Sequence, residues 1–530
     1  MIGLLLPLLA AIPVMSAAVS AVSPWRSVGR VLALAVPLAT ALAGLGLLLL
    51  HRDEPVVVAQ VGGFIPGVSI PMVSDAFTAI MLITTSLVAG LALAFCLVTG
   101  EFARNRYFAP LALLLLAGAN GAILTGDLFN LFVFVEVMLL PSYALIAMTG
   151  TWRRLGTGRL FVVVNLLTST LLLAGVGFVY ATAGAVNLAA LAGAAGEDGR
   201  VAAALGIVIM ALCIKAGAVP VHGWLPRAYP GTSAGVMALF SALHTKVALY
   251  AIIRIWSTAF DLDPAWGRVL LVVALVTTLW GALASAGPRD VREILAWQMV
   301  SGIGVILAAL AVASAPGGSI VYMLHHMVTM GALIMLVGAA EHVYGSGRLG
   351  RLRDLWRLER PLAVLLVLAI AALVGLPPTS GLVGKLEVLS AALDPGTPWG
   401  VVTVVVVLLS SLIGLVAMLR LWRGTMWRDA ADEPSGGSTA DPDDEDRKNN
   451  EDDDTVGPDT HPAERSRIPA RLLVPGGVLV AVSVAMFLGY GAIAPEIDRA
   501  VAGLVDTDTY VQTVLGGPDA FTETTIGGRS

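Results

Sequence analysis

The sequence contains few charged residues for its length. Asp, Glu, Lys and Arg make up 13% of the 530 residues, whereas soluble domains contain about a quarter. Hydrophobic residues account for 57% of the chain. This balance excludes an ordinary soluble protein, and we therefore expect the chain to lie in a lipid bilayer.

Cysteine and the common cofactor motifs are also scarce. Cys96 and Cys213 are the two cysteines, and each lies inside an apolar segment without the spacing of a pair. This argues against a disulfide scaffold or a zinc site. The sequence has no Walker A motif, no dinucleotide glycine pattern in a strand–helix setting and no CxxC pair. We expect no metal, no cofactor, no nucleic-acid partner and no enzyme activity.

Long apolar runs recur along the whole chain, each sufficient to cross a hydrocarbon core of about 30 Å. They have no period of two, and only helices satisfy their own backbone polar groups in lipid, so barrel strands are excluded. The first run has no basic n-region or cleavage site, which favours a retained helix. The sequence predicts an all-α membrane protein with about fourteen transmembrane helices, at residues 1–22, 31–50, 74–98, 110–125, 127–148, 160–180, 201–221, 235–256, 269–285, 295–314, 319–340, 361–393, 401–421 and 472–494.

Basic residues cluster in alternate loops between these predicted helices. The loops that follow odd-numbered helices contain Arg26, Arg30, Arg104, Arg106, Arg153, Arg154, Arg159, Arg227, Arg289, Arg292, Arg348, Arg351, Arg353, Arg357 and Arg360. The other loops contain mainly Arg52, Arg200 and Arg268. Since basic loops stay in the cytoplasm, we expect a plasma-membrane protein with both termini outside.

One segment differs sharply from the rest of the chain. Asp429–Glu464 contains 14 Asp or Glu residues against Arg447 and Lys448 alone. Such a composition cannot bury a core, so it predicts a solvated linker, with an ion-collecting or partner-docking role as the alternative. The predicted layout is a membrane domain at 1–428 with its core at about 100–421, a disordered cytoplasmic loop at 429–470, a last transmembrane helix at 471–494 and a polar tail at 495–530.

Prolines interrupt the seventh and twelfth predicted helices. In Ala211–Ser233, three prolines follow Lys215, and in Val374–Ala392 two prolines precede Lys385. Proline removes a helical hydrogen bond, and such breaks persist in membranes only inside protein or beside a wet cavity. Five helices separate the two breaks, which reverses their orientation. The pattern therefore predicts broken helices related by an inverted repeat.

Ionisable residues lie deep inside several predicted helices. A charge at the centre of a bilayer costs at least ~2.5 kcal/mol, so such residues usually have a function. Lysine can lose its proton where arginine cannot, and histidine has an unperturbed pKa of about 6.5. A Glu136–Lys215 pair would act as a switch, with both groups charged while they are paired. We predict a proton path through Glu136, Lys215, Lys246, His325, His326 and Lys385.

Other polar residues have simpler interpretations. His222 and His244 are expected to be packing or helix-capping residues. Asp127 begins a predicted helix, where a carboxylate caps the backbone and complements the dipole. Adjacent histidines at 325 and 326 point in different directions on a helix, so only one of them would face the path.

Four stretches resemble a known family: VGGFIPGVSIPMVSDAFTAIM (61–81), LTGDLFNLFVFVEVMLLPSYALI (124–146), IKAGAVPVHGWLPRAYPGTSAGVMALFSALHTKVALYAIIR (214–254) and VGLPPTSGLVGKLEVLSAAL (374–393). They are similar to the proton-conducting antiporter-like family, which is shared by complex I membrane subunits and Mrp-type multisubunit Na⁺/H⁺ antiporters. The first two look most like the D-type member of Mrp-type antiporters. The resemblance covers roughly Val61–Trp427.

This resemblance implies a central hydrophilic axis at Glu136, Lys215, Lys246 and Lys385. It implies a proton-translocating subunit of a monovalent cation (Na⁺)/proton antiporter, with other hydrophobic subunits, H⁺, Na⁺ and membrane lipid as partners. Lysine at 385 and the absence of further helices after the fourteenth favour the D-type member.

Two departures from the family pattern leave alternatives open. Met330 stands where a lysine is usual, and Gly302 and Val305 stand where Gln or His and Tyr are common. The chain could instead be a proton-pumping subunit of complex I or a membrane hydrogenase. A third reading is a scaffold subunit that no longer conducts, because a thioether cannot hold a proton.

Overall fold

The computed structural model describes residues 2–148, 152–313, 316–352, 354–394, 396–427 and 467–516. Within these ranges, eleven helices are long and apolar enough to cross a membrane, and three shorter helices are also apolar. The prediction of an all-α membrane protein is confirmed, while the number of fourteen crossings stays a prediction. The acidic segment Asp429–Glu464 lies outside the described residues.

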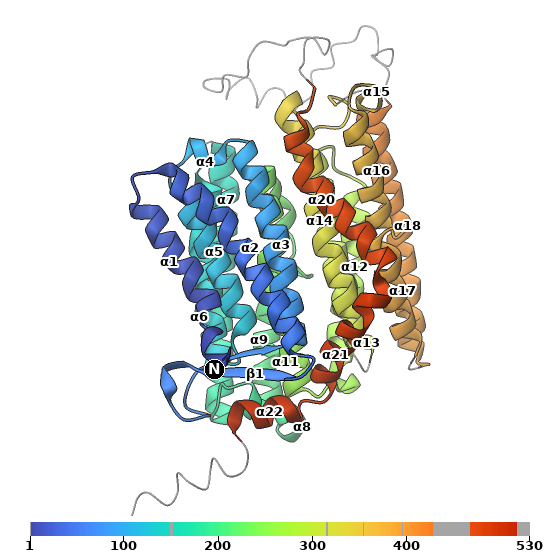
Figure 1. Ribbon diagram of the computed structural model, residues 1–530. Coiled ribbons are helices and arrows are strands. Elements are labelled where there is room, and N and C mark those ends of the chain that lie inside the picture. The colour runs from blue at the N-terminus through green and yellow to red at the C-terminus, as the bar shows by residue number, and fades with distance from the viewer. Residues whose placement is uncertain are drawn as a thin grey trace, which may run out of the picture.

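The elements follow one another as an up-and-down bundle (Figure 1). The first part contains α1 (Leu8–Val22), α2 (Arg26–Leu50), β1 (Val56–Gln60), β2 (Pro71–Asp75), α3 (Ala76–Val98), α4 (Glu101–Arg104), α5 (Phe108–Leu124), α6 (Leu128–Ala147), α7 (Trp152–Ala183) and α8 (Ala194–Glu197). The middle contains α9 (Gly199–Ala216), α10 (Trp224–Ala228), α11 (Ala234–Ala259), α12 (Pro264–Ser285), α13 (Val291–Val312) and α14 (Gly317–Tyr344). The last part contains α15 (Leu355–Leu358), α16 (Arg360–Val374), α17 (Ser380–Leu393), α18 (Pro398–Met426), α20 (Ala470–Leu488), α21 (Tyr490–Val505) and α22 (Asp508–Leu515).

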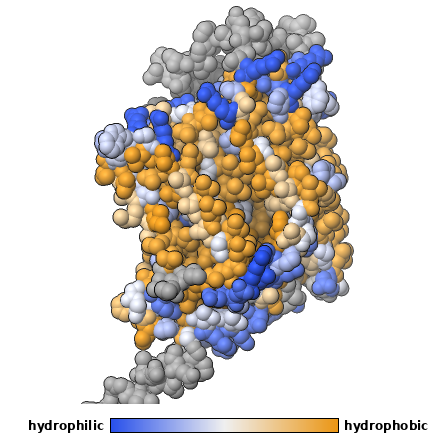
Figure 2. Space-filling model, in the orientation of Figure 1, coloured by the Kyte–Doolittle hydropathy of each residue, from blue (hydrophilic) through white to orange (hydrophobic). Residues whose placement is uncertain are grey.

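On the face shown in Figure 2, a broad apolar belt crosses the bundle and hydrophilic residues gather towards its two ends. In Figure 1, α4 and α15 lie at one end, and β1, α8 and α22 lie at the other. β1 and β2 form an antiparallel pair with Val58 opposite Val73. This arrangement is that of a protein that crosses the membrane many times.

Helices α11, α13 and α14 form the centre of the bundle. In the most apolar 18-residue stretch of each helix, 100% of the residues are buried in α11 and α14 and 94% in α13. The corresponding share is 33% in α2 and in α18. Polar groups on a lipid-facing helix would meet hydrocarbon, whereas those on the central helices can meet one another. The fold therefore places the predicted ionisable residues of α11 and α14 away from lipid.

Both predicted helix breaks are present, and they have the same backbone geometry. α9 ends at Gly217, with φ 93°, and α16 ends at Gly375, with φ 95°. Left-handed conformations are costly for residues with a Cβ, so glycine ends these helices readily. At each break the glycine N–H donates to two carbonyls of the preceding turn. This shared ending supports the predicted inverted repeat.

A buried ion pair joins α11 to the last residue of β2, at the end of the bundle that carries α22. Arg254 donates to both carboxylate oxygens of Asp75 at 2.6 and 2.8 Å, and its guanidinium lies 5.6 Å from the centre of the Tyr510 ring. Burial by itself raises the pKa of the Asp75 carboxyl, but the charge and hydrogen bonds of Arg254 outweigh it and lower the pKa overall. Asp75 also caps α3 through the Thr78 N–H.

The C-terminal part, which the sequence predicts as a polar tail, contains helices in its described residues. Residues 490–505 form α21 and residues 508–515 form α22, and Tyr510 is 3% exposed. The sequence from 495 onward is polar on average, but single apolar residues such as Val514 pack against β1 and β2. Tertiary contacts of these residues hold α22 against the strand pair.

Candidate functional site

Glu136 and Lys215 lie on neighbouring elements near the first break. Glu136 is half-buried in α6, and Lys215 is 2% exposed in the last turn of α9. They are close enough for their charges to interact, yet no ion pair within 4.0 Å joins them in the described residues. Neither the Glu136 Oε1 nor the Lys215 Nζ has a hydrogen-bond partner there. The two side chains are therefore close but not paired.

Trp224 completes the end of α9. Its indole Nε1 donates to the carbonyl of Ile214 at 3.0 Å, a carbonyl in the last turn that also accepts the Gly217 N–H. Lys215 follows Ile214 directly in the chain, so the adjacent helix-end acceptor is occupied. Glu136 is consequently the nearby anionic group available to Lys215.

His244, expected to be a packing or capping residue, packs against Phe161 and Phe240 and lies near Lys215. The residue is buried in α11, and its Nε2 lies 2.6 Å from the Ser142 hydroxyl of α6. It also interacts electrostatically with Lys215. Lys246 follows two residues later on α11, a spacing at which the two side chains point to opposite sides of the helix.

Lys246 is fully buried in the middle of α11. Its Nζ donates to the Thr245 hydroxyl at 3.0 Å and has no carboxylate partner within 4.0 Å among the described residues. Its charge interacts with His326 of α14. Lys246 therefore connects the side of the bundle that holds the first break with the side that holds the second.

The two histidines of α14 have different surroundings. His325 Nδ1 lies 2.8 Å from the Ser380 hydroxyl of α17 and 3.2 Å from the Thr329 hydroxyl. His326 has no hydrogen bond to another side chain of the described chain, and its ring packs against the backbone of Gly302. Both histidines are 0% exposed. They face different neighbours, as expected for adjacent residues on one helix.

Gly302 explains one departure from the family pattern. A Cβ at this position would lie 2.1 Å from His326 Nε2, which is far inside van der Waals contact. A larger side chain at 302 and this position of His326 therefore exclude one another. The glycine lets the imidazole approach α13 closely.

Lys385 lies at the second break, beside a small polar cavity. Its Nζ donates to the Val374 carbonyl at the end of α16, at 2.5 Å. The cavity is lined by Lys385 and by polar side chains of α13, α14 and α18, namely Gln298, Ser301, Tyr322, Ser410 and Ser411. Lys385 also interacts electrostatically with His325. The second break therefore combines a lysine, a helix-end carbonyl and space for water-sized molecules.

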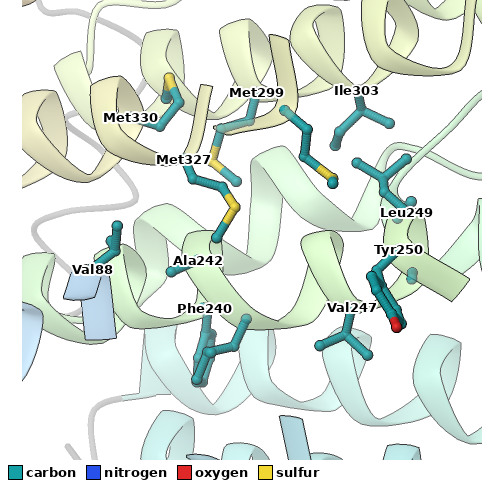
Figure 3. Packing of buried hydrophobic residues seen from close by; sticks show 14 of the residues in the cluster. Val88, Phe240, Ala242, Val247, Leu249, Tyr250, Met299, Ile303, Met327 and Met330 are labelled. Atoms are coloured by element: carbon teal, nitrogen blue, oxygen red, sulfur yellow. The ribbon is translucent and has the colours of Figure 1, made fainter. Parts of the chain in front are cut away.

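Met330 lies in the apolar core and not among the predicted ionisable residues. It is 0% exposed and belongs to the same core cluster as Met299 and Met327, which lie near it on α13 and α14 (Figure 3). Figure 3 shows these side chains between the ribbons of the central helices. At this position the chain provides no group that can hold a proton.

The predicted residues lie on α6, α9, α11, α14 and α17, and together with His244 we call them the row. Within the row, Glu136 interacts electrostatically with Lys215, Lys215 with His244, Lys246 with His326, and His325 with both His326 and Lys385. His222 lies outside the row and packs between Trp280 and Trp297. Asp127 caps α6 through the Asn130 N–H at 2.8 Å, as predicted. No group of three or more His, Cys, Asp or Glu residues could hold a metal ion in the described part of the chain.

Comparisons with known proteins agree with this geometry. The family model described as NADH:quinone oxidoreductase/Mrp antiporter, TM matches residues 125–411, which is more than half of the chain. Among curated relatives, the D subunit of the Na(+)/H(+) antiporter of Bacillus subtilis (strain 168) is 30% identical over 465 residues, covering 86% of this chain and 88% of the relative. The D subunit of the Na(+)/H(+) antiporter of Alkalihalophilus pseudofirmus is 34% identical over 379 residues, covering 70% and 76% of the two chains.

Solved structures show the same similarity. A chain in the structure of the Mrp complex from Dietzia sp. DQ12-45-1b superposes with a TM-score of 0.88 at 40% identity, covering 97% of this chain and 100% of that chain. A chain of the archaeal membrane-bound sulfane sulfur reductase superposes with a TM-score of 0.81 at 22% identity, covering 97% and 100%, which shows a shared fold. The chain belongs to the family of NADH:quinone oxidoreductase and Mrp antiporter membrane subunits.

Proposed function

We propose that the protein is the proton-translocating membrane subunit of a multisubunit monovalent cation (Na⁺)/proton antiporter and not an enzyme. The observation that carries the proposal is the row of lysines and histidines between the two helix breaks. Lysines at this depth, without carboxylate partners within 4.0 Å among the described residues, are expensive in a bilayer. Two relatives named as D subunits of Na(+)/H(+) antiporters and the likeness to a chain of an Mrp complex favour this assembly.

Protons would move along Glu136, Lys215, Lys246, the two α14 histidines and Lys385. Approach of Lys215 to Glu136 would keep both groups charged, and separation would favour transfer of the lysine proton to a neighbour. Because Met330 lies in the apolar core, transfer across α14 must use His325, His326 or water. The cavity beside Lys385 would give the proton access to solvent.

We also propose that the protein lies in the plasma membrane with both termini outside. The arginines near α4 and α15 are at one end of the bundle, which the positive-inside rule assigns to the cytoplasm. The partners would be other hydrophobic membrane subunits, together with H⁺ and Na⁺ or another monovalent cation.

The proposal is tested by Glu136→Ala in the assembled complex in inverted membrane vesicles. We expect Na⁺-dependent proton movement to fall to background while the complex still assembles. The matched control is Glu387→Ala, since Glu387 is a carboxylate on an apolar helix whose partner is the Tyr490 hydroxyl at 2.8 Å, outside the row. Full transport by the Glu136 variant would contradict the proposal.

Two further measurements separate the alternatives. Purification in mild detergent should bring down small hydrophobic subunits, whereas iron–sulfur and flavin subunits would indicate a redox complex.

The variant Met330→Lys tests whether the protein is a non-conducting scaffold. Transport that appears only in this variant would support a scaffold, while transport in the unmodified chain supports the antiporter.

A further inference from the structure

A second cavity lies beside α4, and Figure 1 shows α4 at one end of the bundle. It lies between the α1–α2 turn and the segment that joins α4 to α5. Its polar lining residues are Ser20, Ser23, Arg26, Asn105 and Arg106. No residue of the row lines this cavity.

The lining of this cavity is positively charged. Arg26 donates to the Ala103 carbonyl at 2.7 Å and Arg106 donates to the Ala21 carbonyl at 3.2 Å, so the two arginines bridge the loops on either side. Each bond uses one guanidinium nitrogen, and the remaining N–H groups have no partner in the described chain. No described Asp or Glu lines the cavity, and the nearby Glu101 pairs with Arg104 at 3.6 Å. Two guanidinium edges suit an anion that accepts several hydrogen bonds.

A buried hydroxyl on the cavity wall is also without a partner. Ser20 is 8% exposed, and its Oγ makes no hydrogen bond to any described residue. Gly29 leaves the room for this hydroxyl, because a Cβ there would lie 2.5 Å from the Ser20 Oγ. In addition, α2 begins at Arg26 without a side-chain cap, so its first N–H groups and its positive dipole end lie beside the cavity.

The outer surroundings of the cavity are apolar and aromatic. Val22 is 82% exposed, Trp25 is 71% exposed and Tyr107 is 52% exposed, and all three are adjacent in sequence to lining residues. Tryptophan and tyrosine concentrate at the depth of lipid headgroups. The Arg106 guanidinium lies 5.2 Å from the centre of the Tyr107 ring, at this same level. An occupant with an anionic head and an apolar body would contact both kinds of surface.

We propose that this cavity binds the phosphate of an anionic phospholipid, with Arg26, Arg106 and Ser20 holding the headgroup and the acyl chains lying along α1 and α2. A free phosphate ion has the same headgroup chemistry but would leave the exposed apolar side chains uncovered. Basic pockets between transmembrane helices recognise anionic headgroups by the same charges. The proposal rests on the cavity alone and does not depend on proton transport.

The experiment compares phospholipid retained by the purified assembled complex, measured by native mass spectrometry after reconstitution with phosphatidylglycerol or phosphatidylcholine. In Arg26→Gln/Arg106→Gln we expect phosphatidylglycerol retention to fall by about tenfold. The matched control is Arg30→Gln/Arg104→Gln, which removes two charges from the same two segments outside the cavity and should retain the lipid. Ser20→Ala keeps both bridging arginines and should lower retention by about threefold, even if the double variant fails to assemble.

Three results would overturn the proposal. The first is equal retention of phosphatidylglycerol by the cavity variants and the control. The second is equal retention of phosphatidylcholine and phosphatidylglycerol by the unmodified complex. The third is that inorganic phosphate displaces phosphatidylglycerol and binds the cavity as tightly as the lipid does, which would identify a soluble anion as the occupant.

Discussion

The two helix breaks have the same backbone ending but use their lysines differently. At the first break, Trp224 donates to the carbonyl of Ile214, and the Lys215 Nζ has no hydrogen-bond partner in the described chain. At the second break, Lys385 itself donates to the Val374 carbonyl. The first lysine thus has freedom to move towards Glu136, whereas the second is held at a helix end.

This difference suggests a division of roles between the two halves. A lysine without a fixed acceptor can change partners, and Glu136 is near enough to attract it. A lysine tied to a carbonyl beside a polar cavity can exchange a proton with solvent while staying in place. We infer that the first break contains the switch and the second break contains the access route.

The largest expected effect comes from Lys215→Arg and Lys385→Arg. Each variant keeps a positive charge but cannot release a proton, so we expect transport to fall by about a hundredfold in both. The measurement is Na⁺-dependent dissipation of a pH gradient in vesicles, with assembly checked on a native gel. If Lys385→Arg retained more than half of the activity, Lys385 would only be an anchor for α16 and α17.

A smaller and more selective effect is expected from Gly375→Ala and Gly217→Ala. Both place a Cβ at positive φ, so both should destabilise the fold by a similar ~1–2 kcal/mol. The new Cβ would lie 2.7 Å from Lys385 Cδ at the second break but 2.7 Å from Leu225 Cδ1 at the first. We therefore expect about a tenfold loss of transport for Gly375→Ala and less than about twofold for Gly217→Ala.

Gly217→Ala is the control for Gly375→Ala, because both variants introduce the same backbone strain. Thermal unfolding of the purified complex measures that strain separately from transport. Equal transport losses in the two variants would mean that strain, and not displacement of Lys385, limits the activity.

A smaller loss than that of Gly375→Ala is expected from Trp224→Phe, which makes the first break resemble the second. The ring remains but its N–H donor is lost, so the Ile214 carbonyl becomes more available to the neighbouring Lys215. A hydrogen bond of this kind contributes about 1 kcal/mol, and competition with Glu136 should lower transport by roughly fivefold. Trp280→Phe is the control, since Trp280 is 53% exposed and lies outside the row. An unchanged transport rate in Trp224→Phe would show that the Ile214 carbonyl does not compete with Glu136 for Lys215.

Much of the site was predictable because charge in a membrane is rare. Glu136, Lys215, Lys246 and Lys385 are conspicuous in apolar runs, and the structure buries Lys215 and Lys246 fully and the other two in part. The contact between His244 and the Ser142 hydroxyl could not be predicted, because a buried histidine in the sequence does not reveal which side chains lie beside it. That contact joins two residues more than a hundred positions apart in the chain.

The sequence by itself determined the helical membrane class, the two breaks and the type of chemistry. Length and apolarity leave the helix as the structure that satisfies the backbone in lipid, and proline with glycine ends a helix for local steric reasons. The tertiary structure decided that Trp224 and Lys385 occupy the two helix ends, that Gly302 admits His326, and that Ser20 faces a cavity with Arg26 and Arg106. These arrangements depend on side-chain packing between distant segments, which no local pattern contains.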